Sequence, residues 1–209
     1  MKNVLALFVL VTMTGFAQAQ ETTNKESDKP KAGLFVEPGI IYQSQDTEVD
    51  WGSAVNKSTG KNNGFGANVR LGMHVKEMFF AGLDGRYLLT KFEDSAVNTN
   101  VNAKSYDVAP VIGFQMPDIG LRIWGSYVVW GELDPEKVTS TLINYDAKLS
   151  KANGYRLGAG FHIYSCSINL EYQDLKYDKV EVDVLPANFS PNHASSKGLV
   201  FGVSFPVEL

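Results

Sequence analysis

The stretch GFGANVRLGMHV, residues 64–75, divides its side chains into two classes when every second residue is taken. The positions that begin at Gly64 hold glycine and the polar residues Asn68, Arg70 and His74. The other positions are all apolar: Phe65, Ala67, Val69, Leu71, Met73 and Val75. Because successive side chains of a β-strand point to opposite faces, this stretch predicts a strand with one apolar and one polar face. A soluble barrel would turn the apolar face inward, whereas a membrane barrel would turn it toward lipid.

The N-terminus predicts export. Lys2 is followed by an apolar run at 4–11 and by Ala17-Gln18-Ala19, a small-x-small cleavage site. This pattern is typical of a signal peptide over residues 1–19, with the mature chain beginning at Gln20. The apolar run is shorter than the roughly 20 residues that a spanning helix needs, and no other segment approaches that length. We therefore expect an exported protein without a transmembrane helix.

Composition narrows the class of protein further. The chain has 209 residues, a formal net charge of -4 and a single cysteine, Cys166. Mild acidity and the lack of a basic stripe argue against a nucleic-acid partner. One cysteine excludes an internal disulfide. The mature length suits one β domain.

Alternation recurs along the chain. It appears in eight segments: 34–43, 64–75, 79–90, 105–114, 121–130, 155–163, 167–173 and 199–209. The fifth is irregular, because Trp124, Val128 and Trp130 share the parity of Arg122. Short connections (76–78, 115–120, 164–166) alternate with long ones (44–63, 91–104, 131–154, 174–198). An even strand number with this alternation predicts an all-β fold, an eight-stranded antiparallel transmembrane β-barrel with short periplasmic turns and long extracellular loops.

The barrel is expected over residues 34–209. Residues 20–33 are polar and lack apolar periodicity, so they predict a disordered periplasmic tail. In the loops we place Asn56, Asn98, Ala147 and His193. In the periplasmic turns we place Glu77 and Asp118.

A soluble ligand-binding barrel of the lipocalin type is the rival interpretation. Its water-facing strand surface would be rich in Lys, Glu and Thr, yet the polar face here holds mainly glycine with isolated charges, as in the crowded interior of a narrow barrel. Aromatic residues also gather near the strand ends, as in the girdles of membrane barrels. The predicted girdle comprises Tyr42, Phe79, Phe80, Tyr87, Tyr106, Phe114, Trp130, Tyr155 and Tyr172.

This layout of signal peptide, eight strands, three short turns and four long loops resembles the small outer-membrane barrels of the OmpX and OmpA type. The resemblance implies a monomer in the cell outer membrane that contacts membrane lipids and lipopolysaccharide. It also implies that the barrel assembly machinery recognises the last strand. Such barrels commonly end in an aromatic residue, whereas this chain ends in Leu209, with Phe205 on the same parity.

Charged residues on the inward parity form the main candidate site. They are Glu37, Arg70, Asp84, Arg86, Asp107, Arg122, Arg156 and Glu171. One interpretation is a paired network that fills the barrel, and the other is a selectivity ring of a small-solute channel. Eight strands leave room for little more than side chains, which favours the filled interior.

An enzyme is not expected, and no cofactor or metal-ligand spacing appears. A lipid A deacylase would aim His, Ser and Glu at the lipid, but His162 and Glu171 have inward parity and Ser165 falls in a turn. Palmitoyl transfer or proteolysis would need polar residues gathered at the outer rim, and segment 188–196 is an ordinary polar loop. We interpret Cys166 as a small residue that is buried or lies in a turn.

The loops are where a function is expected to reside. In 137–145 and 176–185 the alternation continues past the expected membrane edge, with Val180, Val182 and Val184 on the parity of Tyr172. Such extensions either recruit an extended partner segment by strand addition or only brace each other. We expect a structural or adhesion protein that binds an extracellular protein through its loops. A small-solute channel is the alternative, and a lipid-modifying enzyme is a weaker one.

Overall fold

The computed structural model describes residues 33–50, 57–76, 78–94, 99–139, 144–183 and 193–209. The predicted signal peptide, most of the predicted tail, Asn56, Asn98 and Glu77 lie outside these residues. No helix in the described part of the chain is long and apolar enough to cross a membrane.

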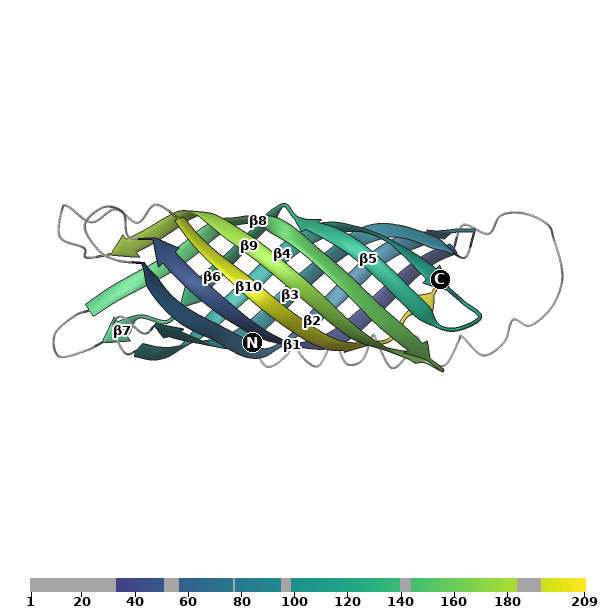
Figure 1. The fold of residues 1–209 in the computed structure, drawn as a ribbon, viewed down its shortest axis with the longest axis horizontal. Helices are drawn as coiled ribbons and strands as arrows, with labels where there is room; N and C mark the ends of the chain where they lie inside the picture. Colours follow the sequence, from purple (N-terminus) through teal and green to yellow (C-terminus); the bar gives the residue numbers. More distant parts are fainter. Residues whose placement is uncertain (1–32, 51–56, 77, 95–98, 140–143, 184–192) are drawn as a thin grey trace. The chain divides into compact units, whose positions relative to one another are not determined.

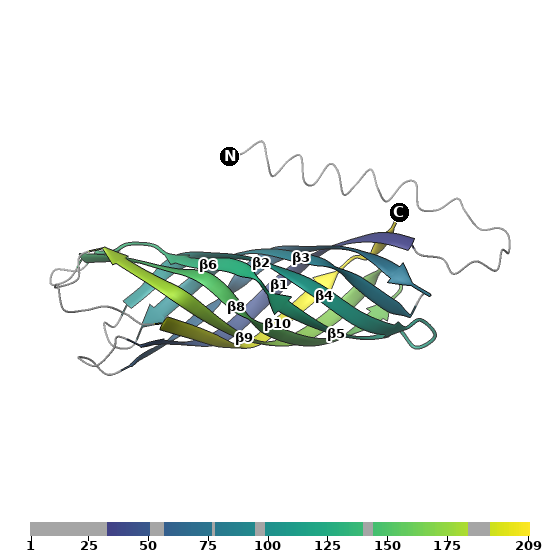
Figure 2. The same cartoon turned by 90° about the horizontal axis from the view of Figure 1, so that it is seen from above.

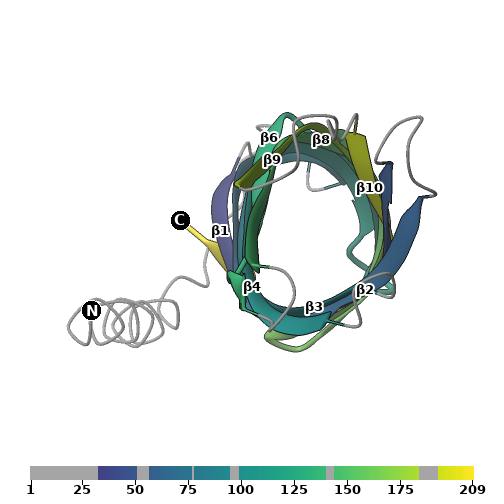
Figure 3. The same cartoon turned by 90° about the vertical axis from the view of Figure 1, so that its left-hand side faces the viewer.

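The described residues form an antiparallel sheet that closes on itself (Figure 3). Its strands are β1 (Gly33–Asp50), β2 (Ser58–Val75), β3 (Phe79–Asp94), β4 (Thr99–Met116), β5 (Leu121–Val128), β6 (Trp130–Pro135), β7 (Val138–Thr139), β8 (Asn144–Ile163), β9 (Cys166–Asp183), β10 (His193–Ser204) and β11 (Val207–Glu208). The sheet follows the order β10-β9-β8-β5-β4-β3-β2-β1, and β10 closes the ring on β1 from Gly39↔Ser204 to Asp50↔His193.

The ring has eight strand positions, as predicted, and we call each position a wall. β5 and β6 are successive parts of one wall, because both pair with β4 on one side and β8 on the other. β11 continues the last wall by pairing with β1 after a break at Phe205 and Pro206. This break corrects the continuous final strand expected to Leu209. β7 pairs only with β8. The eight-stranded fold class is confirmed.

The two ends of the barrel differ (Figures 1 and 2). At the short-turn end, tight connections join β2 to β3, β4 to β5 and β8 to β9, and Asp118 lies in the second of them. At the opposite end, here the loop end, the strands run far into the segments expected to be loops. Ala147 lies within β8 and His193 is the first residue of β10, so the loop positions predicted for both residues are wrong.

The strands extend because their side chains keep alternating beyond the expected membrane edge, with charged and polar residues outward and apolar or uncharged polar residues inward. On β1, for example, Asp46 and Glu48 point outward while Thr47 and Val49 are buried. This pattern is that of a strand in a water-soluble protein and corrects the loops predicted for these segments.

A β-bulge explains the irregular fifth segment. Val111 on β4 pairs with Ser126 on β5, and Val108 on β4 pairs with Trp130 on β6. The chain therefore advances by four residues from Ser126 to Trp130 opposite an advance of only three on β4. Val129 is the extra residue. Val128 therefore points inward at 0% exposure, whereas Val129 and Trp130 both point outward.

A second distortion lies at Lys151 of β8, whose φ of 58° is uncommon for a residue with a side chain. Leu149 and Ala152 on either side are both buried in the interior, although they are three residues apart. The facing strand shifts in the same way, so that Val180 packs against the same core as Tyr177. Our expectation that Val180 shares the outward parity of Tyr172 is therefore wrong.

Candidate functional site

All eight predicted interior charges point into the barrel and are buried, and we call them the central charge network. Glu37 on β1 accepts hydrogen bonds of 2.9 Å from both terminal nitrogens of Arg122 on β5. The Ser204 hydroxyl on β10 donates to the same carboxylate at 2.6 Å. Arg70 on β2 lies 3.6 Å from Glu37, so this carboxylate faces two arginines.

A second group of contacts continues across the barrel. Asp84 on β3 lies 2.8 Å from Arg86 and 3.5 Å from Arg70. Arg86 also reaches Glu171 on β9 at 2.6 Å. The Trp124 indole nitrogen donates to Glu171 at 2.6 Å. Arg70 thus links the two groups through its contacts with Glu37 and Asp84.

The third group is set by Arg156 on β8, which is fully buried. Its guanidinium lies 2.5 Å from Asp107 on β4, and its Nε donates to Gln173 at 3.1 Å. Every wall of the barrel therefore supplies at least one group to these contacts. Buried charges are tolerated when each is paired and hydrogen-bonded, and four arginines here face four carboxylates.

Aromatic rings lie between the central charge network and the short turns. Phe35, Phe80, Val111 and Trp124 form a buried cluster, with Phe80 only 2% exposed. The Arg122 guanidinium lies 5.1 Å from the Phe80 ring centroid, and Arg70 lies 4.9 Å from that of Trp124. Phe80 therefore does not belong to the girdle. Phe80 and Asp84 differ by an even number of positions on β3, so the sequence already indicated that both side chains point inward.

Close packing in this region depends on Gly158. A Cβ at this position would lie 2.2 Å from the Trp124 ring, so the indole occupies the space that a side chain would fill. The short-turn mouth retains a cavity of about 270 Å³ lined by His74, His162, Arg122 and Glu208 among others.

The remaining predicted girdle residues lie on the outer face. Several pair across neighbouring strands: Tyr42 with Phe65, Phe79 with Phe114, Tyr106 with Trp130, and Tyr155 with Tyr172. Tyr87 is 47% exposed. The outer surface between the two aromatic levels is apolar, with Leu71 and Leu83 each more than half exposed.

The interior of the loop end contains an apolar cluster, which the sequence interpretation missed, beside buried uncharged polar side chains such as Gln45, Thr47 and Asn62. We call this cluster the loop-end core: Val49, Phe92, Ala103, Ala109, Val128, Leu133, Leu149, Ala152, Leu175, Tyr177 and Ala194. It fills the barrel above the central charge network. Its residues come from all four segments predicted to be loops, 44–63, 91–104, 131–154 and 174–198, and from Ala109 and Val128 in predicted strands.

The residues of the rejected enzyme hypothesis do not converge. His162 Nδ1 lies 3.0 Å from the Ser167 hydroxyl, and Ser165 lies in the exposed turn after β8. Glu171 contacts Arg86 and Trp124 instead. Within the described residues no three His, Cys, Asp or Glu side chains gather as a metal site would require. The partly exposed Cys166 donates to the Ile163 carbonyl at 3.5 Å.

One strand edge at the loop end lacks a partner among the described residues. β9 pairs with β10 only as far as Tyr177↔Ala194. On its other side β9 pairs with β8 up to Asp146↔Asp183. Residues 178–183 therefore have one paired side and one side on which the described chain supplies no strand, and we call this the β9 edge.

The sequence matches no protein-family model and no curated protein sequence. Solved structures do match. The outer membrane protein OprG from Pseudomonas aeruginosa has a TM-score of 0.51 and 10% identity, over 88% of this chain and 100% of that one. Ail of Yersinia pestis, in complex with the heparin analogue sucrose octasulfate, has a TM-score of 0.49 and 17% identity, over 82% and 99%. Neisserial surface protein A has a TM-score of 0.49 and 11% identity, over 82% and 96%.

At these identities the likeness concerns the fold. Together with the closed ring, the apolar outer band and the buried charges, it shows that this chain has the architecture of the small outer-membrane β-barrels.

Proposed function

We propose that the protein is a non-enzymatic barrel of the outer membrane, closed to solutes, that presents the loop end outside the cell as a binding surface. The observation that carries this proposal is a reversal of polarity along the strands. Near the short turns the outside is apolar and the inside is charged, whereas near the loop end the outside is charged and the inside holds an apolar core together with uncharged polar side chains.

The reversal supports the placement in the membrane. An outward band of apolar residues bounded by aromatic side chains matches lipid and its two interfaces. The short turns then face the periplasm, and the loop end stands in water outside the cell, where a polar exterior around an apolar core is the favourable arrangement.

Two layers support a closed interior. The central charge network fills the barrel within the membrane, and the loop-end core fills it above. A solute would have to separate several buried ion pairs and displace packed side chains. The alternative, a small-solute channel, has the cavity at the short-turn mouth in its favour, but that cavity meets Arg122, which Glu37 holds with two hydrogen bonds.

Conductance in planar bilayers tests this part of the proposal. The wild type is expected to show little or no stable single-channel conductance. Replacement of Arg86 or Arg156 by Ala is expected to raise leakage, because their carboxylate partners lose a pairing group. Lys76→Ala, at the exposed short-turn rim, is the matched control. A large, steady and ion-selective wild-type conductance would favour the channel instead.

The binding surface we propose is the β9 edge. An unpaired strand edge offers backbone N–H and C=O groups to an extended segment of another protein. Val180 anchors this part of β9 to the loop-end core, while Lys179 and Glu181 form an exposed ion pair on the outer face. Strand addition there would extend a sheet that is already folded.

Hydrogen exchange tests the β9 edge with a defined probe, an eight-residue peptide that alternates valine with threonine. The peptide is expected to slow amide exchange in residues 178–183. A version N-methylated at alternate residues has nearly the same composition but cannot pair along one side, so it is expected to leave exchange unchanged. Equal protection by both peptides, or by neither, would exclude strand addition at this edge.

A further inference from the structure

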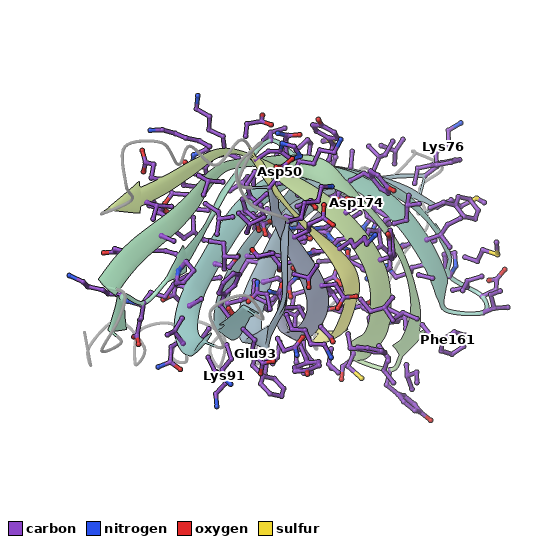
Figure 4. The ribbon with its side chains drawn as sticks, turned by 60° about the vertical axis from the view of Figure 1, so that its left-hand side comes forward. Asp50, Lys76, Lys91, Glu93, Phe161 and Asp174 are labelled. Carbon is purple, nitrogen blue, oxygen red and sulfur yellow. The ribbon has the colours of Figure 1, made fainter. Side chains whose placement is uncertain are left out.

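The β9 edge carries opposite charges two residues apart on its outer face. Lys179 and Glu181 both point outward, with side-chain exposures of 52% and 47%, and form an ion pair. Between them, Val180 packs against the loop-end core. Figures 1 and 4 show the arrowhead of β9 extending at the loop end past the start of β10. Outward charges of one sign would repel a second copy of this edge, whereas charges of both signs can attract it.

The order of these side chains is self-complementary in one antiparallel register. Residues directly opposite each other in an antiparallel pair point to the same face of the sheet. When Val180 lies opposite Val180 of a second copy, Lys179 of each copy lies opposite Glu181 of the other. Asp178 of each copy then lies opposite Val182. Both outward pairs therefore join opposite charges, and the two inward valines meet beside the two loop-end cores.

The neighbouring registers are less favourable. A shift of the second copy by one pair in either direction places Lys179 opposite Lys179, or Glu181 opposite Glu181, and like charges directly opposite each other destabilise a pair. The start of β10 limits the register as well. Because β10 already pairs with β9 at Tyr177↔Ala194, a second copy can pair only from Asp178 onward. The register centred on Val180 uses residues 178–182 of both copies and stops where β10 begins.

We propose that the β9 edge pairs with the β9 edge of a second copy whose barrel lies in an opposing outer membrane. β9 runs from the short turn before Cys166 to the loop end at Asp183. An antiparallel strand runs the other way, so the second barrel points its loop end toward the first and its short turns away from it. Two barrels in one membrane have β9 strands that both run outward. The antiparallel contact therefore joins two cells rather than two neighbours on one cell.

The contact works through number rather than through individual strength. A short edge with two opposite-charge pairs contributes only modestly to association. Many barrels face each other where two membranes meet, and each contact that forms raises the effective concentration for the next. The inference rests on the proposed function, because it uses the same edge in the same outward orientation, and it adds the identity of the partner. Within its own membrane each barrel remains a monomer.

Clustering of lipid vesicles that carry the refolded barrel tests the contact, with light scattering as the measurement. Wild-type vesicles are expected to cluster. Glu181→Lys should slow clustering by about tenfold or more, because Lys179 then meets a lysine in every contact and the loss is repeated across many contacts. Lys179→Glu should have the same effect for the opposite sign. Heat-modifiable migration establishes that each variant is folded, so unchanged clustering by either folded variant would overturn the proposal.

Glu48→Lys is the matched control. Glu48 also forms an exposed ion pair at the loop end, with Lys57, and the substitution changes the net charge by the same amount as Glu181→Lys. Glu48 lies where β1 is paired on both sides, with Ser195 and with Thr59, so it offers no free edge. Vesicles with this variant should cluster like the wild type. An equal loss of clustering would mean that overall charge, and not the β9 edge, drives the association.

The double variant Lys179→Glu/Glu181→Lys tests the register at unchanged net charge. Its vesicles should cluster with one another, because opposite charges still face each other around Val180. They should not cluster with wild-type vesicles, because like charges then meet in both outward pairs. Two fluorescent labels distinguish the vesicle populations. Clustering of the double variant with the wild type, or its failure to cluster with itself, would overturn the proposed register.

The valine–threonine peptide separates this inference from the proposed function. It should compete for the same edge and inhibit wild-type clustering, whereas its N-methylated version should not. If the peptide slows amide exchange in residues 178–183 but wild-type vesicles do not cluster, the edge accepts an extended segment and the second copy is refuted. If the peptide gives no protection and the vesicles do not cluster, both the inference and the binding surface of the proposed function are refuted.

Discussion

The half of the barrel near the short turns and the half near the loop end are built from the same strands with opposite polarity. On β8, Arg156 points inward and Leu157 outward in the first half, while Leu149 points inward and Lys148 outward in the second. On β9, inward Glu171 and outward Tyr172 give way to inward Leu175 and outward Lys176. The same strands run through both halves, and only the bulge at Val129 and the left-handed Lys151 interrupt the regular backbone between them.

The difference teaches that side-chain polarity follows the medium that each face meets. Where lipid surrounds the wall, apolar groups are exposed and charges must find partners within the barrel. Where water surrounds it, burial of apolar groups drives packing in the usual way. In the proposed placement, the outward residues at which polarity changes mark the membrane edge nearer the loop end: 42 to 44, 65 to 63, 89 to 91, 106 to 104, 130 to 132, 172 to 174 and 199 to 197.

The largest expected effect is in the charged interior. Arg156→Ala leaves Asp107 buried without its partner, which should destabilise the barrel by about 3–5 kcal/mol. Replacing both residues, as Arg156→Met/Asp107→Leu, should recover most of this loss. Urea unfolding in lipid vesicles measures both variants. If the double variant is as unstable as the single one, the network stabilises through more than pairing.

A smaller effect is expected at the outer face, where one strand provides both the test and its control. Leu83→Arg on β3 places a guanidinium in lipid and should cost about 2–4 kcal/mol. Glu93→Arg, on the same face of the same strand but in water, should stay within about 0.5 kcal/mol. Insertion yield and heat-modifiable migration report both. Equal behaviour would remove the proposed membrane edge between the two positions.

Lys151 joins the two halves on β8 in a left-handed conformation. Lys151→Gly should stabilise the folded barrel by roughly 1 kcal/mol, because glycine adopts positive φ without a side-chain clash. Lys176→Gly, which introduces glycine into a regular part of β9, should destabilise it. The unfolding midpoints compare the two. A loss of stability in Lys151→Gly would show that its side chain contributes more than its backbone strain costs.

The smallest effect concerns an ion pair in the water-exposed half. Hydrogen bonds from Lys148 and from Tyr106 hold the pKa of Glu132 below its ordinary value. The stability that this lowered pKa provides is therefore present above the unfolded-state pKa and is lost as the pH falls through the folded-state pKa. Lys148→Met should lower the unfolding midpoint slightly at pH 7 and less at strongly acidic pH. An unchanged difference across this range would show that the ion pair contributes nothing.

Much of the fold could be predicted because a period of two is a strong signal wherever lipid lies on one side. The Gly64–Val75 stretch and its repeats determine strand number, order and inward charges. Val129 and Lys151 could not be found, since a single extra residue shifts parity without changing composition. Which arginine pairs with which carboxylate depends on strand stagger, which the sequence does not contain. Phe80 could have been placed correctly, because it shares the parity of Asp84, whereas Leu149 lies beyond the parity shift at Lys151.

The rows of charged residues just above the aromatic level have a mechanical consequence. Asp46, Lys91, Lys104 and Lys197 point outward from different walls at nearly the same level. Sinking the barrel by one outward position would push these groups into hydrocarbon, and raising it would expose Leu71 and its neighbours to water. Both displacements cost free energy, so the depth at which the barrel sits in the bilayer is fixed. The β9 edge is thereby held at a constant height above the bilayer, whatever the thermal undulation of the membrane around it.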